Sequence, residues 1–226
     1  MKFFSLDSPI IRFLSWITDM ILLNIVWIVY SLPVITLGAS TAALYTVVYK
    51  MSSDPYVSIW KTFHKAFVEN FKKATPLFFL LLATCASLVF LEFQWLPVAG
   101  KTSVALYILA LLPMVIFLMS ASMVFPLVAR FDNTLFGTLR NAFLIAMSHI
   151  PTALVMAVVH LIPVIMLFIS PMVLLGGGIA LIFAGASLTA CFNSYLAGRL
   201  LRPFMPKEDD NSDNEVTEDG KHHDAS

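Results

Sequence analysis

Charged residues are scarce in this sequence. Asp, Glu, Lys and Arg make up 12% of its 226 residues, while hydrophobic residues make up 59%. A soluble globular domain is about 25% charged and about 45–50% apolar. The composition therefore excludes an ordinary soluble domain and indicates an all-α, polytopic membrane protein. We therefore expect the lipid bilayer to be its partner, and we expect no nucleic-acid partner.

Cysteine and chemical motifs are equally sparse. The only two cysteines, Cys85 and Cys191, lie within apolar runs, where they are expected to pack as small hydrophobic residues. The sequence has no phosphate-binding loop, no metal-ligand spacing, no nucleophile elbow and no paired acids, and His222-His223 is too little for a metal site. We therefore expect no cofactor and no enzymatic activity. No cleavable signal is apparent, so the first apolar run is expected to stay as an anchor.

The balanced formal charge of zero conceals a strong asymmetry. From Lys207 onward the chain has eight acids and two lysines, which leaves six acids and twelve bases, a net charge of +6, for residues 1–206. A polar, charged tail that is poor in aromatics is typical of disorder. The sequence thus predicts a membrane helical domain at 1–203 and an acidic, disordered cytoplasmic tail at 204–226.

An almost uninterrupted apolar stretch runs from Asp19 to Tyr45. Residues 13–32 have the roughly 20 residues that a bilayer requires of a spanning helix. Pro33 then interrupts the pattern, and the segment to Ser40 is expected to be a turn. The helix resumes at 41–50, and counted from Val34 this second crossing has about 17 residues, the short end of the spanning range. A re-entrant element is the alternative for residues 34–50.

The next segment predicts an amphipathic helix on the membrane surface. Asp54 is a natural N-cap and Pro55 a natural first helical residue. At 100° per residue the aromatic side chains share one face and the lysines share the other. The residues that define this surface helix are Trp60, Lys61, Phe63, Lys65, Phe67, Phe71 and Lys72. The alternative is a helix that packs against the ends of its own bundle, and the two are compatible.

The remaining apolar runs predict four further crossings and a second surface helix. The crossings are expected at residues 74–95, 103–129, 151–169 and from Gly178 to Leu196. Residues 96–102 are expected to form a loop, and Asp132 or Asn133 is expected to cap a short helix before residue 151. In total, the sequence predicts about six crossings and two amphipathic cytoplasmic surface helices.

The distribution of basic residues predicts how the chain is threaded. With six crossings, eleven Lys and Arg side chains fall on one side and only Lys101 falls on the other. Cytoplasmic loops carry the excess of Lys and Arg, so both termini are expected to be cytoplasmic in a multi-pass cell-membrane protein. The outer loops are then very short, so a large partner has to bind from the cytoplasmic side.

Four polar residues within apolar runs are candidate functional sites, because ionisable groups in a membrane are functional candidates by default. Asp19 is expected to lie near the head groups and to pair with Arg12 or a surface lysine, with a proton or cation site as the alternative. Asn24 and Asn193 are expected to form hydrogen bonds between helices rather than to bind a ligand. His160 is expected to be a packed residue, with proton relay as the alternative.

The sequence also resembles a known family. The resemblance rests on Asp19, Asn24 and Trp27, on the turn pattern with Pro33, Thr36 and Gly38 in the stretch LPVITLGASTAALY, and on Phe63, Phe67, Asn70-Phe71 and Ala74. These residues resemble the YesL-like family of small bacterial integral membrane proteins, which is classed as a domain of unknown function. Members of this family are often found beside genes for carbohydrate uptake by ABC systems. No catalytic or binding residues are established for the family.

Two functions are compatible with these observations. The resemblance implies a non-enzymatic accessory or regulatory component linked to carbohydrate uptake, with ABC transporter components as partners. The alternative is a permease or channel subunit that moves a small solute itself. A membrane enzyme would need a polar cavity lined by several of Asp19, Asn24, His160 and Asn193.

Overall fold

The chain folds into helices. A computed structural model describes residues 9–54, 56–102, 104–169 and 185–201, and no strand occurs among them. The α-helices are α1 (Pro9–Ser31), α2 (Leu37–Ser53), α3 (Ile59–Thr102), α4 (Val104–Arg130), α5 (Leu135–Ser148), α6 (Ile150–Ile169) and α8 (Ala186–Leu201), and a 3-10 turn, η1 (Val34–Thr36), joins α1 to α2. The all-helical prediction is confirmed.

Several long apolar helices give the chain the character of a membrane protein. By length and composition α1, α2 with η1, α3 and α4 are long and apolar enough to cross a bilayer. A fifth candidate is the pair α5 and α6, which is bent by 113° at a short break. Residues 170–184, where the start of the predicted sixth crossing falls, lie outside the described residues, as does the tail at 204–226.

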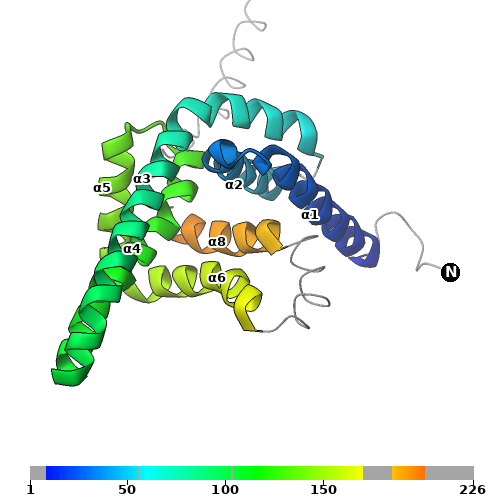
Figure 1. Ribbon diagram of the computed structural model, residues 1–226. Helices are drawn as coiled ribbons and strands as arrows, with labels where there is room; N and C mark the ends of the chain where they lie inside the picture. Colours follow the sequence, from blue (N-terminus) through cyan, green and yellow to red (C-terminus); the bar gives the residue numbers. More distant parts are fainter. Residues whose placement is uncertain (1–8, 55, 103, 170–184, 202–226) are drawn as a thin grey trace, which may run out of the picture.

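Helix α3 corrects the predicted boundaries. The expected surface helix and the expected crossing at 74–95 form one continuous helix of 44 residues, which also includes the predicted loop at 96–102. Figure 1 shows its cyan first part running along α1 and α2 before the helix turns and descends beside α4. The loop prediction was wrong because Pro97 and Gly100 are tolerated within helices of membrane proteins.

The helix starts near residues 54 and 134 also differ from the predictions. Asp54 is the C-cap of α2, and its carboxylate accepts a hydrogen bond from the Tyr56 backbone at 2.8 Å, whereas α3 begins at Ile59. The N-cap of α5 is Thr134, whose hydroxyl accepts from the Gly137 backbone at 3.2 Å, rather than Asp132 or Asn133. Hydroxyl and carboxylate side chains compete for these roles, and the turn geometry decides between them.

The α1–α2 turn is held by side-chain hydroxyls. The Thr36 hydroxyl lies 2.6 Å from the carbonyl oxygens of both Tyr30 and Pro33, so it satisfies acceptors at the end of α1. The hydroxyls of Ser31 and Ser40 lie 2.6 Å apart across the turn. The turn predicted at Pro33–Ser40 is therefore present in its first part, and α2 begins already at Leu37.

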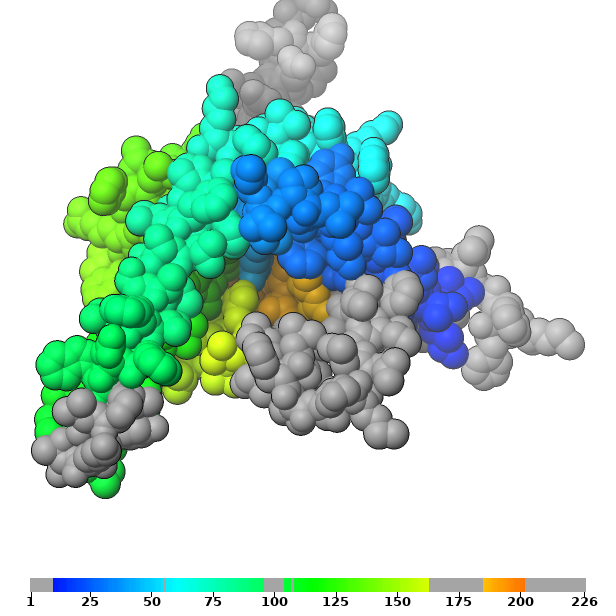
Figure 2. Space-filling model, in the orientation of Figure 1, coloured from blue at the N-terminus to red at the C-terminus, as the bar shows by residue number. Residues whose placement is uncertain are grey.

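The first part of α3 packs closely along the α1–α2 hairpin, as the joined blue and cyan surfaces of Figure 2 show. The Tyr30 ring packs at a tilt against Phe63 and edge-on against Phe67, and its hydroxyl lies 2.8 Å from His64 Nδ1. The side chain of Phe63 is fully buried. At Gly38 the backbones of α2 and α3 come so close that a Cβ atom would collide with the Ala74 carbonyl oxygen.

Both ends of α2 lie near the same end of the α3–α4 pair. Gly38, at the start of α2, packs against Ala74, and Tyr49, near its end, lies under the guanidinium of Arg130 at 3.9 Å. Lys73, next to Ala74, is in turn bound to Asp132, two residues after Arg130. We call this region, defined by Lys73, Arg130 and Asp132, the basic end.

The Gly38 contact makes a testable prediction about stability. Gly38→Ala places a methyl group against backbone atoms, so we expect a loss of about 1–3 kcal/mol from overpacking. This loss exceeds the gain of about 1 kcal/mol that alanine brings to a helix. Thermal unfolding of the purified protein in detergent measures the difference.

The matched control is Gly198→Ala in α8, where the added Cβ would meet Arg130 Nη2 at an ordinary 3.6 Å. This variant should be as stable as the natural chain or slightly more so. Equal stability of the two variants would contradict the close approach of α2 and α3.

Candidate functional site

Two of the four predicted polar residues meet in the interior of the bundle. His160 of α6 lies between α2 and α8: its Nε2 atom is 3.2 Å from the Tyr45 hydroxyl, and its Nδ1 atom is 3.0 Å from Nδ2 of Asn193. Nδ1 is also 3.0 Å from the Met156 carbonyl oxygen. Tyr45 and Asn193 are buried. We call Tyr45, His160 and Asn193 the polar triad.

A neutral imidazole satisfies the polar triad in two ways. When Nε2–H donates to the Tyr45 oxygen, Nδ1 accepts from the Asn193 amide. When Nδ1–H donates to Met156, Nε2 accepts from Tyr45, and the Asn193 amide has to present Oδ1, which otherwise has no hydrogen-bond partner among the described residues. In either state the three side chains bind one another, as buried polar groups require.

Asn24 forms a second interhelical contact, as the sequence predicted. Its Oδ1 atom accepts a hydrogen bond from the Ser187 backbone N–H at 3.1 Å, and the Ser187 hydroxyl donates to the Met20 carbonyl oxygen at 2.8 Å. Ser187 lies near the start of α8, so these two hydrogen bonds join α1 to α8.

Asp19 belongs to neither cluster. It lies half-buried on α1, and within the described part of the chain it makes no ion pair with Arg12 or with a lysine of α3. The expected pairing of Asp19 is therefore not found there. The structure brings together His160 and Asn193 only, so the four candidates do not form one site.

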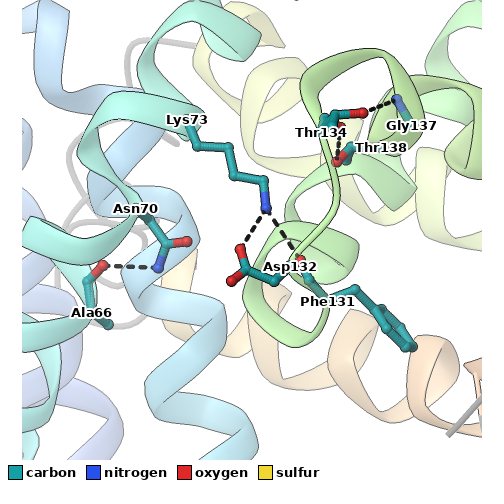
Figure 3. A network of polar contacts seen from close by, with 8 residues as sticks. All are labelled: Ala66, Asn70, Lys73, Phe131, Asp132, Thr134, Gly137 and Thr138. Carbon is teal, nitrogen blue, oxygen red and sulfur yellow. Dashed lines mark hydrogen bonds and ion pairs between the residues drawn. The ribbon is translucent and has the colours of Figure 1, made fainter.

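The basic end is organised by Lys73. Its ammonium group donates to Asp132 Oδ1 at 3.1 Å and lies 3.4 Å from the Phe131 carbonyl oxygen, and Figure 3 shows this side chain reaching from α3 to the loop before α5. Thr134 then caps α5, and the Thr138 hydroxyl donates to the Thr134 carbonyl at 3.0 Å. These bonds fix the loop that connects α4 to α5.

A groove of about 820 Å³ opens beside this loop, between the last turns of α2 and α4. Lys50, Asp54, Arg130 and Asp132 bring charge of both signs to its wall. A smaller, largely apolar cavity of about 330 Å³ lies between α4, α5 and the end of α8. Among the described residues no group of His, Cys, Asp and Glu could hold a metal ion.

The predicted surface helix presents both faces as its periodicity indicates. Phe63 is buried, whereas Lys61, Lys65 and Lys72 are exposed. Lys65 pairs with Glu69 at 3.9 Å along the same helix. Trp60 and Phe71 are partly exposed, so the aromatic face is only partly covered by the α1–α2 hairpin.

Sequence reasoning missed Tyr45, Tyr49, Ser187 and Arg130 as members of these clusters. Tyr45 and Tyr49 are one helical turn apart in α2, and this spacing on an apolar helix was the available signal. Ser187 and Arg130 carry no comparable signal, because their partners are distant in sequence.

The comparisons with known proteins point to one family. Residues 20–93 match the family described as "Protein of unknown function, DUF624". The match covers about half of α1, the turn, α2 and the larger part of α3, which together are about a third of the chain. No curated protein and no solved structure matches. The family description names no activity, so the match supports the recognition of a domain of unknown function and nothing finer.

The polar triad makes a testable prediction. Tyr45→Phe removes a hydroxyl and leaves His160 Nε2 without its partner, so we expect a cost of about 1–3 kcal/mol in unfolding free energy. Tyr195→Phe is the control, because Tyr195 is 61% exposed on α8. Thermal unfolding in detergent compares the two, and a Tyr45→Phe protein as stable as Tyr195→Phe would show that the hydroxyl contributes nothing.

Proposed function

We propose that this protein is a non-enzymatic accessory component of a membrane uptake system, which binds its partner at the basic end. The observation that carries the proposal is the contrast between the interior and this end. In the interior, the members of the polar triad bind one another across helices, and Asn24 binds Ser187 across helices. At the basic end, by contrast, charged groups and large apolar side chains are exposed.

The exposed side chains at this end suit a protein partner. Phe136, in the first turn of α5 and four residues after Asp132, is 83% exposed. Exposed aromatic anchors with charged neighbours are typical of protein–protein interfaces. The resemblance to a family found beside carbohydrate uptake genes suggests an ABC-type sugar transporter as the partner.

The proposal includes a revised threading of the α1–α2 hairpin. The first part of α3 carries five charged residues between Lys61 and Lys73 and belongs at the cytoplasmic surface rather than in hydrocarbon. The turn near Gly38 packs against Ala74, at the end of that charged part. These contacts favour the re-entrant alternative for residues 34–50, with the turn on the cytoplasmic side.

Cysteine labelling tests this threading. Ile35→Cys in the turn, Lys65→Cys on the surface part of α3 and Trp95→Cys in the far part of α3 each place a thiol at an exposed position, in a chain without Cys85 and Cys191. With a membrane-impermeant maleimide, Ile35→Cys and Lys65→Cys should label in inside-out vesicles. Trp95→Cys should label in intact cells. Labelling of Ile35→Cys in intact cells would contradict the revised threading and support the simple in-and-out hairpin, in which the turn lies outside.

Co-purification tests the accessory function. The full chain, extracted in mild detergents, should recover transporter components, and Phe136→Ser should reduce this recovery by about tenfold, as expected for a binding hot spot. Phe93→Ser is the matched control, because Phe93 is 80% exposed on the far part of α3. Recovery of no transporter component in several detergents would contradict the proposal.

Flux measurements separate the accessory function from a permease. Liposomes that contain this protein alone should show no uptake of a labelled sugar above the protein-free background. Uptake by this protein alone, or with only an ATPase added, would identify it as the transport path.

A further inference from the structure

The groove between α2 and α4 shares Arg130 and Asp132 with the basic end and adds Lys50 and Asp54, which the proposed accessory function does not involve. Arg130 ends α4, and the ring of Tyr49 supports its guanidinium at 3.9 Å. Lys50, in the last turn of α2, lines the same groove with its side chain exposed. Two cations, one of them held in place by an aromatic ring, therefore face one cavity.

The two acids of the groove differ in their surroundings. Asp132 is bound by Lys73 at 3.1 Å. Asp54 accepts one hydrogen bond, from the Tyr56 backbone, and makes no ion pair with Lys50 within the described part of the chain. A carboxylate has about four acceptor positions, so Asp54 retains capacity for a further donor.

The position of the groove indicates where its occupant comes from. Its walls are the final residues of α4, a candidate membrane span, and of α2, which ends at the same surface in the re-entrant threading proposed above. The head groups of a bilayer lie where the apolar part of such helices ends. Val57 and Phe131 add an apolar wall beside the charges. A lipid head group therefore matches the groove in both depth and surface chemistry.

We propose that this groove binds the head group of a phosphoethanolamine lipid. Lys50 and Arg130 donate hydrogen bonds to the phosphate oxygens, and the primary ammonium group donates to the Asp54 carboxylate. A choline head group has no N–H donor, and a glycerol head group has no positive charge for Asp54. The groove consequently selects for both ends of the zwitterionic head group.

Native mass spectrometry of the full chain tests the selectivity. The protein is released from vesicles that contain equal amounts of phosphatidylethanolamine, phosphatidylcholine and phosphatidylglycerol with the same acyl chains, and the retained lipids are counted. We expect several-fold more phosphatidylethanolamine than either competitor. Lys50→Gln should lower its retention by about tenfold, the effect of losing one charge-assisted hydrogen bond.

Asp54→Asn separates the two ends of the head group. Asparagine still accepts the Tyr56 hydrogen bond, so the turn is kept, but the preference for phosphatidylethanolamine over phosphatidylcholine should disappear. Lys65→Gln is the control, because Lys65 lies on α3 outside the groove and pairs with Glu69. This variant should keep the preference of the natural chain.

Three results would overturn the proposal. They are equal retention of phosphatidylethanolamine and phosphatidylcholine by the natural chain, retention of phosphatidylglycerol at or above that of phosphatidylethanolamine, and unchanged retention of phosphatidylethanolamine in Lys50→Gln. Soluble glycerophosphoethanolamine and inorganic phosphate are added as competitors at the lipid concentration. Competition by either would assign the groove to a free phosphate compound instead. None of these results depends on a transporter partner.

Discussion

The close approach of α2 to α3 at Gly38 and Ala74 determines much of this architecture. A residue with a Cβ atom would force the two helices apart at this point. With the helices in contact, the first part of α3 buries Phe63 against the hairpin. Tyr45 and Tyr49 follow Gly38 on the same face of α2, where the Tyr45 hydroxyl contacts His160 of α6 and the Tyr49 ring contacts Arg130 of α4. The contact at Gly38 therefore belongs to the same helix face as the contacts of both tyrosines.

The interior of the bundle follows from the cost of an unpaired polar group. Such a group loses the hydrogen bonds of water and regains them only from the protein. His160 obtains them from Tyr45, Met156 and Asn193, and Asn24 obtains one from the start of α8. A transport path needs polar groups that are available to a passing solute. Side chains already engaged with each other across helices are what the proposed accessory function requires of them.

Hydrophobic length and periodicity were sufficient to predict the helices but not their junctions. The limits of α4 and α6 were predicted to within one residue, because each has a long apolar run with clear ends. The junction in α3 was missed because the change from an amphipathic to an apolar pattern at Ala74 looks like a boundary, although the backbone continues without a break. Local patterns report on the surroundings of a helix, and only its hydrogen bonds decide where the helix ends.

The candidate site also shows how far local sequence patterns can predict contacts. Asn24 and Asn193 could be predicted as interhelical hydrogen-bonding residues, since an amide in an apolar run has few other roles. Their partners could not, because Ser187 is 163 residues from Asn24 and His160 is 33 residues from Asn193. The expected pairing of Asp19 is not found within the described residues. Lys73 of α3 binds Asp132 of the loop between α4 and α5 instead. The partner of a charged side chain is thus decided by how the helices pack, as Lys73 and Asp132 show, and not by the distance between the two residues along the chain.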